Sequence, residues 1–187
     1  MKKILLLVSL FALLGCKKQL PSIYTSSELK VIAALEKSDI YKALMKAEIP
    51  VMYTICNNVL ELDRDDLGVH MARGKHHGIA ICMGRDKSVE DYLETLQHEA
   101  IHALQFCESP YTNQPYFLHS ENVKEAKEDG SFKRIDEFVR AEYEKDNYEI
   151  EFEAFHLQGS NITDVVPEWI EESCILTSEN APDIFFN

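Results

Sequence analysis

The sequence predicts an α+β fold that is rich in helix. In four stretches, apolar residues recur at intervals of three and four, which is the spacing of amphipathic helices. These stretches are residues 25–47, 89–107, 131–159 and 167–176. Two short runs, 51–56 and 78–84, have the apolar and β-branched content of strands. With 187 residues, the chain has about the size of one domain.

The first helix is expected to begin at Thr25, because Thr25 and Glu28 have the spacing of a capping box. Its apolar pattern continues to about residue 47, and Pro50 ends it before the first strand. The stretch 57–75 is polar and acidic, with room for one or two short strands. The next run, 78–84, is bounded by glycines and predicts a strand directly before the second helix.

The helix over 89–107 has the clearest signals. Ser88 is a suitable N-cap, and acidic residues follow in the first turn, where the helix dipole favours negative charge. Farther along, 108–132 contains prolines and polar residues and predicts an irregular connection. A helical pattern then runs over 131–159, with Asp146 and Asn147 as a predicted interruption, and Pro167 fits the first turn of a last helix.

The N-terminus predicts export. Residues 1–15 combine two lysines with a short apolar run, as in a signal peptide. The sequence Leu-Leu-Gly-Cys that ends at Cys16 resembles the lipobox of bacterial lipoproteins. That resemblance implies a lipid on Cys16, a tether over 16–24 and a single mature domain over 25–187 at the cell envelope, at the outer membrane or in the periplasm. Ordinary secretory cleavage and an uncleaved anchor are the alternatives.

Charge excludes one class of partner. Removing residues 1–15 takes away two lysines and no acids, so the formal net charge moves from -13 to -15. A chain this acidic is not expected to bind nucleic acid. Nothing in the sequence indicates an oligomer, and we expect a monomer.

Four cysteines remain if Cys16 carries lipid, and an even number in an exported domain predicts two disulfides. Three pairings are open. We favour Cys56 with Cys82, because both lie in strand-like runs, and Cys107 with Cys174, which would join the 89–107 helix to the last helix. Four reduced, buried cysteines are the alternative.

Functional chemistry is concentrated in the pentapeptide His98-Glu99-Ala100-Ile101-His102. Histidines four apart share one face of a helix and can bind one metal ion. Glu99 is then placed to take a proton from a metal-bound water. A chance match on an amphipathic helix is the alternative, and the well-specified helix around the motif argues against it.

A catalytic zinc usually has three protein ligands, so a further one is needed. Glu149 and Glu153 are four apart on a downstream helix, where one could bind the metal and the other could orient a ligand histidine. The pattern resembles the gluzincin branch of the zinc metallopeptidases, with its His-Glu-x-x-His and Glu-x-x-x-Asp helices. It spans only about 93–107 and 148–155, and Glu153 stands where the family has aspartate.

That resemblance implies zinc bound by His98, His102 and Glu149, with Glu99 as general base and Glu153 in the orienting position. Glu153 is the alternate third ligand and Glu142, four before Asp146, the next. It also implies a minimal zincin-like domain, with a small antiparallel sheet beside the motif helix. The strand at 78–84 would border a peptide substrate, or else be an ordinary core strand.

Two further sets of residues could have a role at the site. Tyr143, Tyr148 and His156 are candidates to stabilise an oxyanion, although core packing is the more common role of the tyrosines. His76 and His77 are interpreted as exposed loop residues.

The function that these observations favour is a zinc-dependent peptidase that acts on a peptide or protein substrate. The first alternative is a lipid-anchored binding or inhibitory protein whose zinc is structural or whose fold has lost turnover. The second is a lipoprotein in which the pentapeptide has no metal.

Overall fold

The computed structural model describes residues 24–55, 67–73, 76–108, 133–145, 147–158 and 164–180. Several predictions therefore lie outside the described residues: the signal peptide over 1–15, the lipid on Cys16, and the roles of Cys56 and Asp146. Within the described ranges, no helix combines the length and the apolar character needed to cross a bilayer.

A three-stranded sheet forms one layer of the molecule, in the order β1-β3-β2. β3 (His76–Met83) is central; it pairs antiparallel with β2 (Gly68–Arg73) and parallel with β1 (Val51–Ile55). The α+β class is confirmed, but the expectation of an antiparallel sheet holds for only one of the two strand pairs. The chain reverses direction into β2 and again into β3, so β3 enters beside β1 in the same direction.

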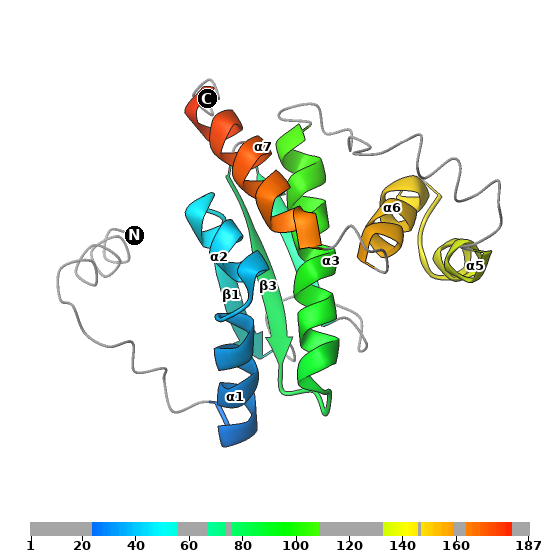
Figure 1. The fold of residues 1–187 in the computed structure, drawn as a ribbon. Coiled ribbons are helices and arrows are strands. Elements are labelled where there is room, and N and C mark those ends of the chain that lie inside the picture. The colour runs from blue at the N-terminus through cyan, green and yellow to red at the C-terminus, as the bar shows by residue number, and fades with distance from the viewer. Residues whose placement is uncertain are drawn as a thin grey trace, which may run out of the picture.

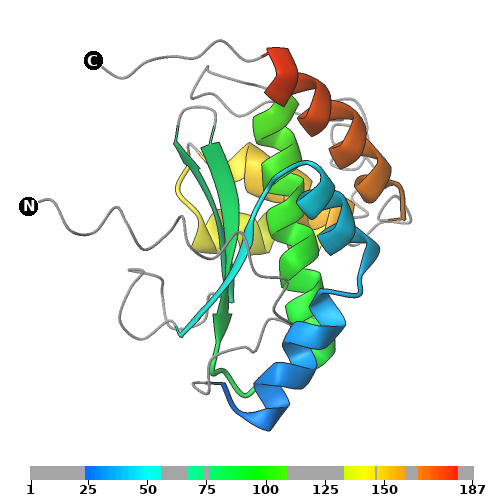
Figure 2. The same cartoon turned by 90° about the vertical axis from the view of Figure 1, so that its left-hand side faces the viewer.

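Four helices lie on one face of this sheet (Figure 1, Figure 2). They are α1 (Ser26–Leu35), α2 (Asp39–Lys46), α3 (Val89–Glu108) and α7 (Val166–Asn180). Consecutive residues of β3, Ile79 to Met83, are all buried, as expected of a central strand. The prediction of a strand at 78–84 is therefore confirmed, and its core role, rather than a place at the border of a substrate, is the one observed.

The predicted helix over 25–47 is two helices. Thr25 and Glu28 form the expected capping box at the start of α1. The break follows from Ser38, whose hydroxyl accepts a hydrogen bond from the backbone N–H of Tyr41 and so caps a second helix. Apolar periodicity ran through this break, because both helices turn an apolar side to the same core.

α3 begins and ends within one residue of the prediction. Ser88 caps it: the backbone N–H of Asp91 donates to the Ser88 hydroxyl at 3.1 Å, and the Asp91 carboxylate accepts from the Ser88 backbone N–H at 2.8 Å. α3 contacts β2 and β3 of the sheet and also α1, α2, α6 and α7. It is therefore the element that joins the parts of the molecule.

Two further helices extend from α3 on the side away from α1 and α2 (Figure 1). α6 (Tyr148–Gln158) packs on α3, and α5 (Lys133–Glu142) packs on α6. The predicted helical stretch over 131–159 is thus divided near residue 146, as expected. Val139, Tyr148 and Phe152 form a small apolar cluster between α5 and α6, apart from the main core.

A disulfide bond ties two of the helices together. The predicted disulfide between Cys107 of α3 and Cys174 of α7 is present, and it closes a loop of 67 residues in sequence separation. Cys82 on β3 is also disulfide-bonded; the expected partner, Cys56, lies outside the described residues. Both Cys107 and Cys174 are buried, so the bond lies within the packed contact of the two helices.

Replacing both Cys107 and Cys174 with alanine is expected to lower the free energy of unfolding by about 2–4 kcal/mol, because the unfolded chain loses a long covalent loop. Urea denaturation without reductant measures this change and leaves other disulfides intact. An unchanged unfolding midpoint would show that α7 is held to α3 by packing alone.

Candidate metal site

Three side-chain atoms converge where α6 packs on α3. The Nε2 atoms of His98 and His102 lie 3.1 Å apart, and Oε2 of Glu151 lies 3.3 Å from the first and 3.4 Å from the second. His98 is buried, while His102 and Glu151 are partly buried. Within the described ranges, this is the group of three ligating side chains close enough to hold one ion.

The spacing of these atoms fits a tetrahedral ion. Ligand atoms at about 2.0–2.2 Å from zinc in tetrahedral geometry lie roughly 3.3–3.6 Å from one another. The three measured separations, 3.1, 3.3 and 3.4 Å, fall at or just below this range. Three protein ligands leave the fourth corner of the tetrahedron for solvent or substrate.

Both histidines are oriented by glutamine side chains. Nδ1 of His102 lies 2.8 Å from Oε1 of Gln105, and Nδ1 of His98 lies 3.2 Å from Oε1 of Gln158. A carbonyl oxygen only accepts, so each Nδ1 is the protonated nitrogen that donates. In the neutral ring Nε2 then carries the free lone pair, which is the form that binds a metal.

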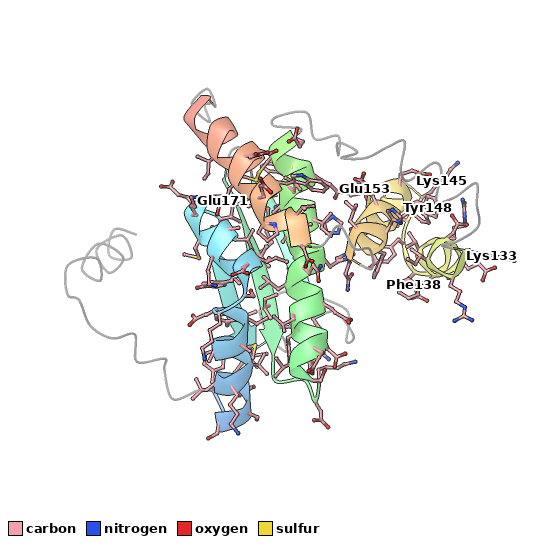
Figure 3. All side chains as sticks on the ribbon, viewed as in Figure 1. Lys133, Phe138, Lys145, Tyr148, Glu153 and Glu171 are labelled. Carbon is pink, nitrogen blue, oxygen red and sulfur yellow. A yellow bond between two sulfur atoms is a disulfide. The ribbon has the colours of Figure 1, made fainter. Side chains whose placement is uncertain are left out.

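The amide of Gln105 has its own fixed orientation. Its Nε2 donates to Oε2 of Glu153 at 2.8 Å and to the backbone carbonyl of Ile150 at 3.3 Å, which turns Oε1 towards His102. Glu153 is fully buried on α6 (Figure 3). Glu153 was expected to orient a ligand histidine by a direct hydrogen bond. In the structure its carboxylate bonds Gln105, and Gln105 bonds His102, so this link to the histidine is indirect.

The predicted third ligand, Glu149, is wrong, because the structure brings Glu151 to the histidines instead. Glu149 is exposed in the first turn of α6, where its charge is favourable to the helix dipole. Glu142, ranked third, is exposed at the end of α5. The carboxylate of Glu153, the alternate ligand, accepts a hydrogen bond from the side-chain amide of Gln105.

A signal for Glu151 was present in the sequence. Glu151, Phe155 and Gln158 follow one another at i, i+4 and i+7, so they share a face of α6. All three contact the ring of His98: the carboxylate at 3.3 Å, the phenyl ring at a centroid distance of 4.4 Å and the amide at 3.2 Å. The spacing of Glu149 and Glu153, on which the predicted third ligand was based, does not indicate which face of α6 turns towards α3.

Glu99 is held by α3 on one side and by β2 on the other. The backbone N–H of His70 donates to its carboxylate, and Gly68 lies against its side chain. A Cβ at residue 68 would lie 2.6 Å from Cγ2 of Thr95 and 3.0 Å from Cγ of Glu99, so only glycine allows this approach. The strand therefore fixes the carboxylate next to the two histidines.

The pKa values of the two carboxyl groups at the site are shifted in opposite directions. Burial raises the pKa of Glu99, although His102, His98 and the N–H of His70 oppose the change. Burial also acts to raise the pKa of Glu151, but hydrogen bonds and charge from His102 and His98 outweigh it and lower that pKa to about 2. Glu151 is thus anionic at neutral pH, and Glu99 is the stronger base.

The other candidates from the sequence have different places. Tyr148 and His156 are buried, and both rings contact Phe152 within α6. Tyr143 is partly buried beside Phe138 and Phe155. The expectation of an exposed loop at His76 and His77 is wrong, because both lie on β3.

Comparison of the chain with known protein families, with curated proteins and with solved structures finds no match. The chemistry of the site is therefore argued from its own geometry.

A pair of histidines beside the site makes stability depend on pH. His77 lies within the sheet and its Nδ1 is 3.0 Å from Nε2 of His70 on β2, with the ring of Phe106 against both. Burial lowers the pKa of His77 from 6.5 to about 4, and burial, with the charges of His77 and His102, lowers that of His70 to about 3. Both histidines are thus neutral in the folded protein at pH 5.

We expect the metal-free protein to lose stability as pH falls from about 6.5 towards 3–4. In that window the unfolded chain takes up protons at His70 and His77 that the folded chain does not accept. Urea denaturation at a series of pH values measures the slope. His77→Gln should flatten it, and equal slopes for the two proteins would contradict the assignment.

Proposed function

We propose that the protein is a zinc-dependent peptidase, with His98, His102 and Glu151 as metal ligands and Glu99 as general base. The observation that carries the proposal is the convergence of two imidazole nitrogens and one carboxylate oxygen at tetrahedral spacing. Its similarity to the gluzincin pattern supports the same reaction, with Glu151 in place of the residue first expected.

Zinc is the metal that this donor set favours. Two histidines and one carboxylate, with a position left open, is the ligand set of catalytic zinc in peptidases. A harder ion such as Ca²⁺ or Mg²⁺ prefers oxygen ligands and higher coordination numbers. Bound at this site, zinc would polarise a carbonyl group and make a water more acidic.

The residues around that ion have separate tasks. Glu99, whose pKa burial raises, accepts the proton of the attacking water and returns it to the leaving amine. The N–H of His70 keeps the Glu99 carboxylate in place between these two transfers. Gln105 and Gln158 keep the histidine rings in the tautomer that binds metal.

The strand β2 could bind the substrate along its free edge. It is an edge strand of the described sheet and carries Gly68 and His70, which contact Glu99. Backbone groups at a sheet edge can pair with an extended peptide and bring its carbonyl groups alongside the strand. We infer that the substrate is an unfolded or extended peptide segment, which the protein, exported and lipid-anchored through Cys16, meets at the cell envelope.

The ligand assignment predicts a contrast between two glutamates on one helix. Glu151→Ala should weaken zinc binding by about 100-fold or more, because a ligand is lost. Glu149→Ala removes the same group from the exposed side of α6 and should leave zinc affinity unchanged. Competition with a chelating dye measures both affinities. Equal effects of the two substitutions would refute Glu151 as a ligand.

The catalytic assignment predicts that Glu99→Gln retains zinc but loses peptide hydrolysis by about 10²–10⁴-fold, because the amide cannot accept the proton. Cleavage of an unfolded, mixed-sequence protein by the zinc-loaded variant and wild type measures this loss. Zinc bound by the wild type without cleavage of several such substrates would favour a surface binding or inhibitory protein instead. Protein purified without chelator that contains no zinc would indicate a motif without metal.

A further inference from the structure

A row of aromatic rings leads from the metal site to the surface. The ring of His98 lies 4.4 Å from that of Phe155 on α6, centroid to centroid. The ring of Phe155 in turn meets that of Phe138 on α5 edge-on, at 5.3 Å and an interplanar angle of 86°. Tyr143 lies 6.1 Å from Phe155 and 6.4 Å from Phe138. The three rings thus form one aromatic wall beside a metal ligand.

Phe138 is the exposed end of this wall. It is 47% exposed, whereas its neighbour Val139 is fully buried in the cluster between α5 and α6. Val139 supplies the buried part of the contact between α5 and α6, whereas Phe138 meets Phe155 of α6 and still has nearly half of its surface exposed. Figure 3 shows Phe138 on α5, at the edge of the pair formed by α5 and α6.

Two pairs of opposite charge lie along α5. Arg140 pairs with Asp136 at 2.9 Å, and Lys133 pairs with Glu137 at 3.7 Å. The guanidinium of Arg140 also lies over the ring of Tyr148. Arg134 and Glu142, four residues before and after Phe138, are exposed as well, so Phe138 is the apolar contact between charged groups of opposite sign.

We propose that Phe138 and Phe155 form a subsite that takes a large apolar or aromatic side chain of the substrate, next to the bond that is cleaved. This inference rests on the proposed peptidase function and adds its substrate class. The wall begins at a metal ligand, so a side chain held against it belongs to a residue close to the reacting carbonyl. Aromatic rings stack well in offset or edge-on pairs, which extends the pattern already present in the wall.

The test compares two blocked peptides of glycine, serine and alanine that differ in one central residue, phenylalanine or alanine. Zinc-loaded wild type should cleave the phenylalanine peptide with kcat/KM about tenfold higher, because an aromatic side chain is buried on binding. Mass spectrometry should find the cleaved bond next to the phenylalanine. Phe138→Ala should remove most of this preference, and Phe138→Leu should keep part of it.

Met52→Ala is the matched control. Met52 is 46% exposed, close to the 47% of Phe138. It lies on β1, the edge strand opposite β2, and not on α5 or α6. Its substitution should leave the preference of wild type unchanged. Both variants should bind zinc as wild type does, which separates substrate selection from metal loss. A preference that is the same in wild type and Phe138→Ala would overturn the subsite.

Binding to zinc-loaded Glu99→Gln separates the two proposals. Tighter binding of the phenylalanine peptide by about tenfold, lost with the added Phe138→Ala, supports the subsite even if wild type hydrolyses neither peptide. In that case the peptidase proposal fails, and Phe138 and Phe155 stand as a binding site for an aromatic side chain without cleavage. Hydrolysis by wild type with equal kcat/KM for both peptides would leave the peptidase and remove the subsite, and binding of neither peptide would also remove it.

Discussion

The packing of α6 on α3 is the contact on which the candidate site depends. α3 alone supplies two histidines and a glutamate, and α6 adds Glu151, whose carboxylate is the third group that could bind a metal ion. The same contact brings Gln158 to His98, and Ile150 and Glu153 to Gln105. A small shift of α6 along α3 would therefore remove Glu151 from the histidines and, at the same time, break the hydrogen bonds that orient both rings. Each buried donor or acceptor left unpaired would cost about 1–3 kcal/mol.

Much of the fold follows from local signals. The limits of α3 and the capping by Thr25 and Ser88 could be predicted because a cap is a contact between residues three apart. The parallel pairing of β1 with β3 could not, since it joins strands that are separated in sequence by β2. The break at Ser38 was missed for a related reason: two helices that face one core share a continuous apolar pattern.

The candidate site likewise contains residues that could be predicted from the sequence and residues that could not. His98, Glu99 and His102 come from one turn and a half of one helix, so their spacing alone places them on one face. The third ligand depends on how α6 is rotated about its axis, and the sequence offered Glu149, Glu151 and Glu153 within five residues. Their positions on α6 decide among them: Glu149 is exposed, Glu153 bonds Gln105, and Glu151 faces the histidines. His70 was missed because its role comes from a tertiary contact. The contact of Gln105 with His102 is local, but the orientation of its amide is set by Glu153 and Ile150 of α6.

X-ray absorption at the zinc edge of the zinc-loaded protein tests the account most directly. It should show about one zinc per chain, with only nitrogen and oxygen neighbours at about 2.0–2.2 Å and the outer scattering of two imidazole rings. Sulfur neighbours at about 2.3 Å, a first shell without imidazole, or the absence of stoichiometric zinc would contradict a centre built from His98, His102 and Glu151.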